Sequence, residues 1–403
     1  MMEAKRTLGY KIEPQKYLYG IGEVFEGAID DAVRPEQTQE LIAAMGFQSM
    51  RLWMHHKKLF RSDENDEIFF EEEALKRFHN YVDALTERGV KHLVSMNHSY
   101  LYPAQFDGDR ESECEVPLPK TACYLKFLQM IERSYELIAR EFPEISYYEV
   151  GNEVNMHRFI AKPHFPVGKI SEREYDPQYC YTRREKAEIT ADICYYARRG
   201  IKKGNPNAFV VLPAPTPFFG YTDCAEFVEE IYLSIESGRF PTGLKADTDA
   251  DHYFEVLAWH PYNFGGDSSI FVNGCNEIYA VAVKHGDLGK KVFITEFGYH
   301  DFDFVQSGRC KTKEEADALQ ASFLYTDFKA FREELPYVET VHIFRLYDWV
   351  AGPGIEIDFG LFTSPAQTGK IAPKEKGKAM YKIIRGEDAD IEKICVYAKG
   401  EEK

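Results

Sequence analysis

The stretch of residues 144–155, EISYYEVGNEVN, decides the fold of this chain. Its first half is rich in β-forming residues and its second half is a polar step, a pattern that predicts a buried strand delivering Asn152 and Glu153 at its C-terminal end. A second stretch, KVFITEFG at residues 291–298, has the same form and ends beside Glu296. Because rigid parallel strands hold such side chains at the mouth of a cleft, the two strand-end carboxylates favour acid/base or nucleophilic chemistry.

The rest of the chain alternates strand patterns with helix patterns. We expect strands at residues 17–25, 49–54, 90–96, 144–150, 208–213, 254–259, 291–298 and 340–345. We expect helices at residues 35–45, 72–88, 121–141, 183–203, 223–236, 313–334 and 373–384, and the end of another helix at 278–285. Eight parallel strands joined by crossovers fit a closed (β/α)8 TIM barrel of the α/β class better than an open sheet. The barrel is predicted to be a single catalytic domain over residues 1–385, followed by a C-terminal tail at 386–403.

Composition limits the classes of partner. The 403 residues carry a formal net charge of −17 and are 44% hydrophobic, which fits a globular protein with a sizeable core. The negative charge argues against a nucleic-acid partner and favours a neutral ligand. No apolar run is long enough to span a membrane, and residues 1–16 lack the apolar region of a signal peptide. The eight cysteines are scattered and favour reduced thiols, so a cytoplasmic location is expected, with the earlier removal of a leader left open.

Two motifs carry a resemblance to a known group of enzymes. Asn152-Glu153 and the segment Ile-Thr-Glu-Phe-Gly around Glu296 resemble the strand-end motifs of glycoside hydrolase clan A, the retaining (β/α)8 glycosidases. Within the clan, residues 147–155 are most similar to glycoside hydrolase family 39 and its neighbours, although family 39 more usually has Trp-Asn-Glu-Pro-Asn where this chain has Gly-Asn-Glu-Val-Asn. The resemblance implies that Glu153 is the general acid/base, that Glu296 is the nucleophile and that Asn152 hydrogen-bonds the sugar 2-hydroxyl.

Three further positions match the clan. The resemblance implies that Arg51, on the second strand, keeps Glu296 ionised and oriented, as a nearby cation does on physical grounds. It implies that His260 and Tyr262 form the sixth-strand pair, with the Tyr262 hydroxyl donating to the nucleophile. In a barrel the two glutamates can converge to about 5 Å, the separation in retaining glycosidases, and a separation above roughly 10 Å excludes the assignment. We expect Glu153 to hold a proton near neutral pH.

Tryptophans and long loops surround the predicted mouth. Trp53, Trp259 and Trp349 lie at strand ends, where each ring either stacks on a sugar or plugs the barrel. Trp349 is the best candidate for a platform in the first subsite. The loops at 101–120 and 154–181 are expected to wall one end of the cleft, which favours exo action.

Polar residues near the mouth are candidates for sugar binding. His55, Asn97 and His98 suit sugar hydroxyls or structural hydrogen bonds, and His56 is a weaker candidate. The histidines lack ligand spacing such as His-x-x-x-His, and the acidic run at 247–251 lacks the Gly and distal Glu of an EF-hand. We therefore expect no metal and no cofactor.

Together these observations predict a retaining glycoside hydrolase that acts on a neutral, β-linked saccharide by double displacement. The alternatives are a transglycosylase with the same site, a non-catalytic carbohydrate-binding barrel, and a divalent-metal lyase or isomerase. The expected partner is an oligosaccharide or glycoside substrate. The sugar, exo or endo action and the oligomeric state stay open.

Overall fold

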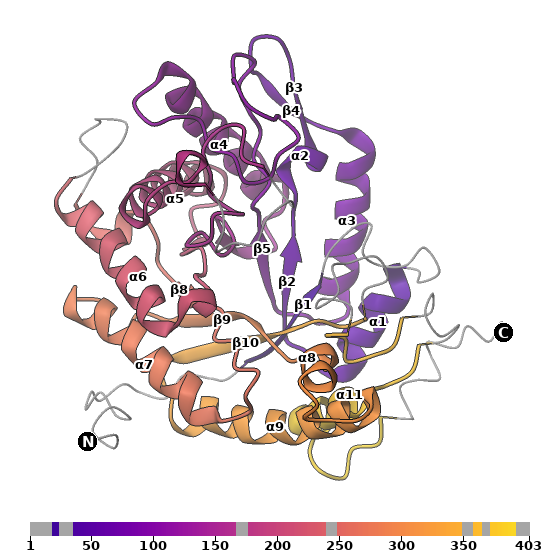
Figure 1. Cartoon of the computed structure of the whole chain (residues 1–403). Coiled ribbons are helices and arrows are strands. Elements are labelled where there is room, and N and C mark those ends of the chain that lie inside the picture. Colours follow the sequence, from indigo (N-terminus) through magenta and orange to yellow (C-terminus); the bar gives the residue numbers. More distant parts are fainter. Residues whose placement is uncertain are drawn as a thin grey trace.

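The computed structural model of the chain describes residues 18–23, 35–166, 176–238, 248–348, 358–364 and 371–391. Among these residues, eight parallel strands curl into a barrel surrounded by helices (Figure 1). The strands are β1 (Leu18–Glu23), β2 (Ser49–Trp53), β5 (His92–Met96), β6 (Ile145–Glu149), β7 (Phe209–Val211), β8 (Leu257–Trp259), β9 (Val292–Phe297) and β10 (Val338–Phe344). Their order is β7-β6-β5-β2-β1-β10-β9-β8. A parallel bridge between Val211 and Val256 joins the two outer strands, so the predicted (β/α)8 barrel is confirmed.

The helices between the strands cover the outside of the barrel (Figure 1). They are α1 (Pro35–Met45), α3 (Glu72–Glu87), α4 (Ala122–Glu141), α5 (Arg183–Gly204), α6 (Tyr221–Glu236), α7 (Ser268–Lys284), α9 (Lys313–Glu333) and α11 (Glu375–Arg385). Local sequence explains their ends; α5, for example, begins with a capping box between Thr182 and Glu185. Close packing explains a glycine inside α5, because a Cβ on Gly200 would lie 2.0 Å from the carbonyl oxygen of Glu132 in α4.

Some elements were not anticipated from the sequence. After β2 the chain forms α2 (His56–Leu59) and an antiparallel hairpin of β3 (Phe60–Ser62) and β4 (Ile68–Phe70), and α8 (Asp301–Gln306) follows β9. Helix α7 starts at Ser268, ten residues before the predicted segment at 278–285. Its first half contains Ser, Asn and Gly, which are weak helix formers, so packing against Tyr221 rather than propensity forms this part.

The barrel interior changes from apolar to polar toward the C-terminal ends of the strands. An apolar layer fills the middle and consists of Val94, Tyr147, Val211, Ala214, Val256, Ala258 and Phe293. Residues two positions further along a strand lie on the same face, so Glu149 follows Tyr147 and His260 follows Ala258. Both are fully buried. The strand period therefore brings ionisable groups to one end of the barrel.

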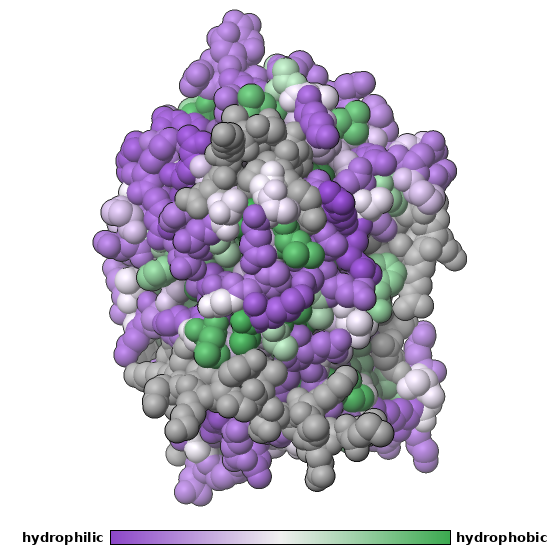
Figure 2. Space-filling view, turned by 90° about the vertical axis from the view of Figure 1, so that its left-hand side faces the viewer, coloured by the Kyte–Doolittle hydropathy of each residue, from purple (hydrophilic) through white to green (hydrophobic). Residues whose placement is uncertain are grey.

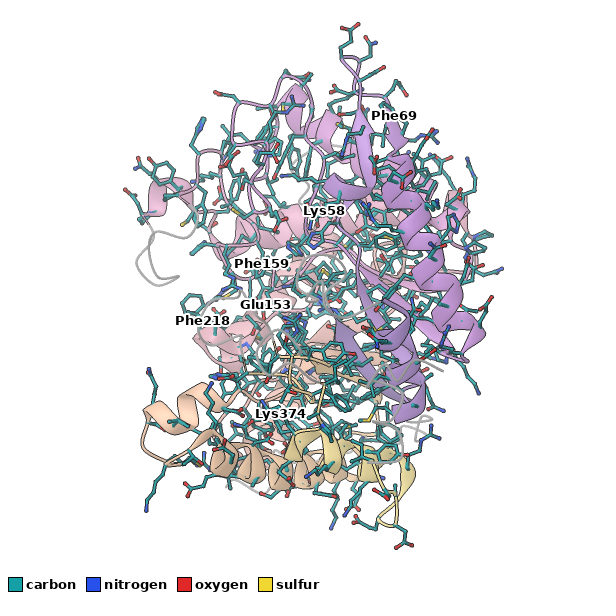
Figure 3. All side chains as sticks on the ribbon, turned by 90° about the vertical axis from the view of Figure 1, so that its right-hand side faces the viewer. Lys58, Phe69, Glu153, Phe159, Phe218 and Lys374 are labelled. Carbon is teal, nitrogen blue, oxygen red and sulfur yellow. The ribbon has the colours of Figure 1, made fainter. Side chains whose placement is uncertain are left out.

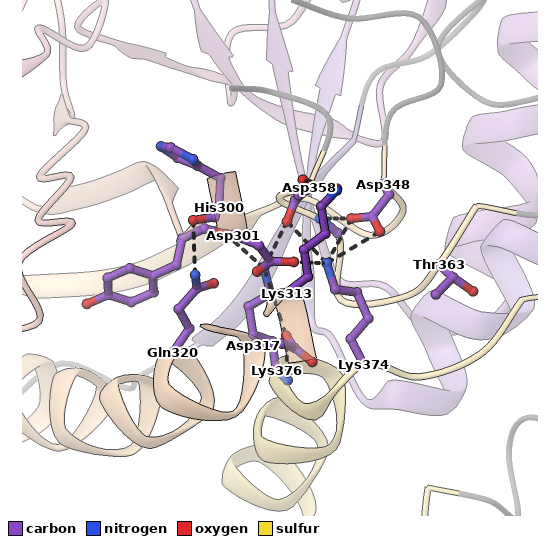
Figure 4. Close-up of polar contacts among 12 residues, drawn as sticks. His300, Asp301, Lys313, Asp317, Gln320, Asp348, Asp358, Thr363, Lys374 and Lys376 are labelled. Carbon is purple, nitrogen blue, oxygen red and sulfur yellow. Dashed lines mark hydrogen bonds and ion pairs between the residues drawn. The ribbon is translucent and has the colours of Figure 1, made fainter. Parts of the chain in front are cut away.

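Buried ion pairs tie the end of the barrel to α11 (Figure 4). The Lys374 ammonium lies 2.9 Å from Asp301 and 3.1 Å from Asp348, and Lys376 lies 3.1 Å from the other oxygen of Asp301. Burial lowers the pKa of Lys376, and the charge on Lys374 lowers it further. These pairs fix α8 and the exit of β10 against α11, so the loops beyond β9 and β10 start from a rigid base.

Several predictions concern the ends and the surface of the molecule. Helix α11 ends at Arg385, where the tail was predicted to begin, and that boundary stays a prediction. Seven of the eight cysteines lie in the described ranges and are free thiols, whereas Cys395 lies outside them. No helix in the described part of the chain combines the length and the apolar character needed to cross a membrane. The face drawn in Figure 2 is mainly hydrophilic, with small separate hydrophobic areas.

A buried acid in α9 makes stability depend on pH. Asp327 is fully buried and accepts a hydrogen bond of 2.6 Å from the Tyr299 hydroxyl. Burial raises the pKa of its carboxyl from 3.8 to about 7. Between these values the folded protein keeps a proton that the unfolded chain releases. Stability from this group is therefore lost as the pH rises from about 4 to about 7.

We expect Asp327→Asn to raise the free energy of unfolding at pH 8 by about 2 to 4 kcal/mol and to have little effect near pH 4. The amide keeps an acceptor for Tyr299 and carries no charge. Urea unfolding at both pH values measures the difference. The exposed Asp388→Asn is the matched control and should change neither value. An equal effect of Asp327→Asn at both pH values would show that the carboxyl does not titrate as described.

Candidate active site

Arg51 on β2 is the centre of the polar end of the barrel. Its side chain is fully buried, and three of its nitrogens donate to three different partners. Nε donates to Glu149 Oε2 at 2.6 Å, Nη1 to Glu296 Oε1 at 2.5 Å, and Nη2 to Asn152 Oδ1 at 2.8 Å. The two carboxylates raise the pKa of Arg51 above its usual value despite burial, so the guanidinium is always charged. The planar, forked guanidinium of Arg51 therefore orients side chains from β6, β9 and the loop after β6.

A β-bulge brings Glu296 to this fork. Ile294 of β9 pairs with Val341 of β10 and Phe297 pairs with Ile343, so three steps on β9 match two on β10. Simple alternation would turn only one of two neighbouring residues inward, and the extra residue allows both Thr295 and Glu296 to contact interior groups.

The environment of Glu296 keeps its carboxylate ionised. Burial opposes ionisation, but the charges of His260 and Arg51 and the hydrogen bonds from Tyr262 and Arg51 outweigh it, so the pKa of Glu296 is lowered. The Tyr262 hydroxyl donates to Glu296 Oε2 at 2.9 Å. Burial and the nearby Glu296 charge raise the pKa of Tyr262 well above 10, so this hydroxyl stays a neutral donor.

Glu153 lies opposite Glu296 at the mouth. It has a left-handed backbone, with φ of 42°, which is unusual for a non-glycine residue and turns the chain sharply after β6. His260 Nδ1 lies 3.1 Å from Glu153 Oε1 and 3.6 Å from Glu296 Oε2. Carboxylate oxygens of the two glutamates lie within 4.8 Å of each other, well inside the 10 Å limit set from the sequence. Figure 3 shows Glu153 between Phe159 and Phe218 in that view.

A second polar cluster contains two predicted histidines. His98 Nε2 lies 3.3 Å from Glu113 Oε2, and His55 Nδ1 lies 3.7 Å from Glu113 Oε1. The Trp53 ring meets the His98 ring edge-on at 5.6 Å. Burial lowers the pKa of His55 to about 4, and the hydrogen bond from His98 lowers that of Glu113 to about 2. The cluster therefore offers a neutral imidazole and an ionised carboxylate at neutral pH.

Other predicted residues have structural contacts. Asn97 Oδ1 accepts from the backbone N–H groups of His56 at 3.0 Å and Ser99 at 3.1 Å, so this oxygen holds the loop after β5. Trp259 is buried and donates from Nε1 to Cys275 Sγ at 3.1 Å, which places it in the core against α7 rather than at the mouth. Trp349 lies outside the described residues.

The two long loops pack on each other in the part that the structure describes. A parallel bridge joins Glu115 to Ala161, and Phe165 N donates to Glu115 Oε1 at 3.0 Å. Beyond β7, the side chain of Asn155 donates to Thr216 O at 2.8 Å and accepts from Thr216 N at 3.0 Å. The loop that carries Glu153 is thereby fixed against the next exit loop.

Two groups of donor atoms in the described ranges are close enough together to hold a metal ion. One is His55, His98 and Glu113, a donor set that divalent metals accept. The other is Glu153, His260 and Glu296, where the fixed charge of Arg51 opposes a cation. The absence of a metal stays a prediction.

Three residues of these clusters were not singled out from the sequence: Glu149, Thr295 and Glu113. Glu149 Oε1 accepts from the Thr295 hydroxyl at 3.0 Å and from Ala214 N at 3.3 Å. The available signal was its place two residues after Tyr147 on an apolar strand. Glu113 lies in a loop, where no sequence period marks it.

Comparison with known proteins finds solved structures only. No protein-family model and no curated protein matches the chain. A family 39 glycoside hydrolase from Bacteroides cellulosilyticus aligns with a TM-score of 0.61 at 15% identity over 93% of this chain, which spans only 64% of that protein. A β-xylosidase from Caulobacter crescentus gives 0.58 at 15% identity over 93% of this chain and 69% of that one. A β-glucosidase from Thermotoga maritima gives 0.61 at 11% identity over 94% of this chain and 100% of that one. These alignments each cover more than nine-tenths of the chain and show that it has the barrel fold of these glycosidases.

Proposed function

We propose that this protein is a retaining glycoside hydrolase that cleaves a neutral, β-linked glycoside by double displacement. The observation that carries the proposal is the close pair of carboxylates, Glu153 and Glu296, in unequal surroundings. Retaining enzymes hold the two groups about 5 Å apart, whereas inverting enzymes need roughly 6.5 to 9.5 Å to admit a water. The fold supports the proposal, since the similar structures are named as a β-xylosidase and a β-glucosidase.

The first chemical step forms a covalent intermediate. Glu153 gives its proton to the glycosidic oxygen as the bond from that oxygen to the anomeric carbon breaks. The Glu296 carboxylate bonds to the anomeric carbon on the opposite face. Arg51 and Tyr262 hold the two oxygens of Glu296, so the nucleophile is charged and oriented before substrate binds.

The second step reverses the roles. The Glu153 carboxylate takes a proton from water while the water oxygen bonds to the anomeric carbon and Glu296 leaves. Asn152 Oδ1 already accepts from Arg51, which leaves its amide nitrogen to donate to the sugar 2-hydroxyl. We propose that His55 and His98 hydrogen-bond the remaining sugar hydroxyls and that the Trp53 ring packs against the apolar face of the sugar.

Organisation and location follow as parts of the same proposal. We propose one catalytic domain up to residue 385 and a cytoplasmic location. Seven free thiols within the described ranges suit a reducing compartment.

A panel of nitrophenyl α- and β-glycosides of xylose, galactose, glucose and arabinose tests the proposal. We expect release of nitrophenol from one or more β-glycosides and, by proton NMR, a β-sugar as the first product. Activity should be unchanged in EDTA, because the proposed mechanism uses no metal. An α-sugar as first product would contradict retention, and loss of activity in EDTA would favour a metal enzyme. Binding of oligosaccharides without turnover would favour the non-catalytic barrel, and transfer to an added alcohol would identify a transglycosylase.

A further inference from the structure

A chain of four side chains runs from the barrel interior to the mouth. Glu149 Oε1 accepts from the Thr295 hydroxyl at 3.0 Å, and Thr295 Oγ1 lies 3.0 Å from His260 Nε2. His260 Nδ1 lies 3.1 Å from Glu153 Oε1. The first three residues have almost no exposure to solvent. Solvent therefore does not compete for these hydrogen bonds.

The direction of each hydrogen bond follows from the number of protons. Glu149 is a carboxylate beside Arg51, so it only accepts, and the single hydroxyl proton of Thr295 is donated to it. Thr295 Oγ1 must then accept from His260, which makes Nε2 the protonated nitrogen. His260 Nδ1 is left facing Glu153 Oε1, and one shared proton completes that contact.

The surrounding charges favour keeping this proton. Arg51 supplies one positive charge against the two carboxylates of Glu149 and Glu296, so these three groups together carry one negative charge before the proton shared by His260 and Glu153 is counted. A third carboxylate there is opposed by the other two. Within the described residues, three further titratable groups near His260 and Glu153 are neutral: Tyr262 after β8, Cys224 on α6 and His342 on β10.

We propose that Glu149 and Thr295 are positioning residues that fix the tautomer of His260 and thereby hold the catalytic proton on the hydrogen bond between His260 Nδ1 and Glu153 Oε1. This inference rests on the proposed function. In the first step the proton moves from that hydrogen bond to the leaving oxygen as the glycosidic bond breaks. In the second step a proton from water restores it as the water oxygen attacks the anomeric carbon.

We call the hydrogen-bonded chain of Glu149, Thr295, His260 and Glu153 the relay. Thr295→Val tests it, because valine has nearly the same shape as threonine and no hydroxyl. Without the acceptor, His260 Nε2 is no longer favoured as a donor in this buried place, so the ring takes the other tautomer and donates from Nδ1 to an ionised Glu153. The pair then carries one proton less. We expect the basic limb of kcat/KM to move to lower pH by about one unit.

Leaving-group dependence gives a second readout. A phenyl glycoside needs protonation of its leaving oxygen, whereas a dinitrophenyl glycoside does not. We expect the ratio of kcat/KM for dinitrophenyl over phenyl glycoside to rise about 10- to 100-fold in Thr295→Val. Thr295→Ser keeps the hydroxyl and should restore the wild-type ratio and pH profile. An equal loss on both substrates, an unmoved basic limb, or a Ser variant that behaves like Val would overturn the relay.

Nitrogen NMR of histidine-labelled protein decides the same question without turnover. The His260 signals are assigned from a His260→Gln variant among the 12 histidines. We expect an Nε2–H tautomer or doubly protonated ring in the wild type and in Thr295→Ser, and an Nδ1–H tautomer in Thr295→Val. The same tautomer in all three proteins would overturn the relay. If the wild type cleaves no glycoside, the proposed function is contradicted. The NMR experiment needs no turnover and therefore tests the relay separately.

Discussion

Glu296→Gln is expected to lower kcat by roughly six orders of magnitude, the size of effect seen when a covalent nucleophile is removed from a protease. An amide oxygen is a poor nucleophile, so the glycosyl-enzyme cannot form. Glutamine keeps one oxygen that accepts from Arg51, and its amide NH2 group can donate to the Tyr262 hydroxyl, so the barrel should still fold. Initial rates on the best nitrophenyl β-glycoside measure the loss, and thermal melting checks the fold.

Mass spectrometry adds a direct observation of the intermediate. A slow 2-fluoro glycoside should add one sugar to the wild-type chain, at Glu296, and none to the variant. Glu333→Gln, on the exposed side of α9, is the matched control and should keep wild-type rates. Residual activity of Glu296→Gln within about 100-fold of wild type would remove Glu296 from the nucleophile role.

Glu153→Ala should have an effect that depends on the leaving group. For a phenyl glycoside we expect kcat/KM to fall about 10²- to 10⁴-fold, because the leaving oxygen is no longer protonated. For a dinitrophenyl glycoside the first step should proceed, and the glycosyl-enzyme should accumulate because no base activates water. Stopped-flow measurement of the dinitrophenol burst separates the two steps.

Added azide should restore turnover of this variant on the dinitrophenyl substrate, since the anion attacks without a base and fits the space left by the carboxylate. The product should be a β-glycosyl azide, and the basic limb of the pH profile should disappear. Survival of that limb, or an equal loss on both substrates, would speak against Glu153 as the acid/base.

Strand order and the convergence of the two glutamates could be predicted, because both depend on local patterns that repeat along the chain. The facing of Trp259 was also within reach: Ala258 and His260 point into the barrel, so strand alternation turns Trp259 outward against α7. Strand alternation, rather than the residue type alone, therefore separates the two possible roles of Trp259.

Other features depend on contacts between distant segments. The bulge on β9, which lets both Thr295 and Glu296 reach interior groups, comes from the register with β10 and has no local signal. Glu149 contacts Arg51 and Thr295 on two other strands, and Glu113 contacts the histidines from a loop. Such partners become visible only when the strands are placed side by side.

The three-way pairing of Arg51 also limits how this sequence can change over evolution. A lysine at this position carries one compact charge and cannot donate to Glu149, Glu296 and Asn152 at the same time. Even the conservative substitution of Arg51 by lysine therefore removes some of these three contacts. An exchange of any one partner leaves the other two and a buried cation to be compensated. The four positions therefore constrain one another.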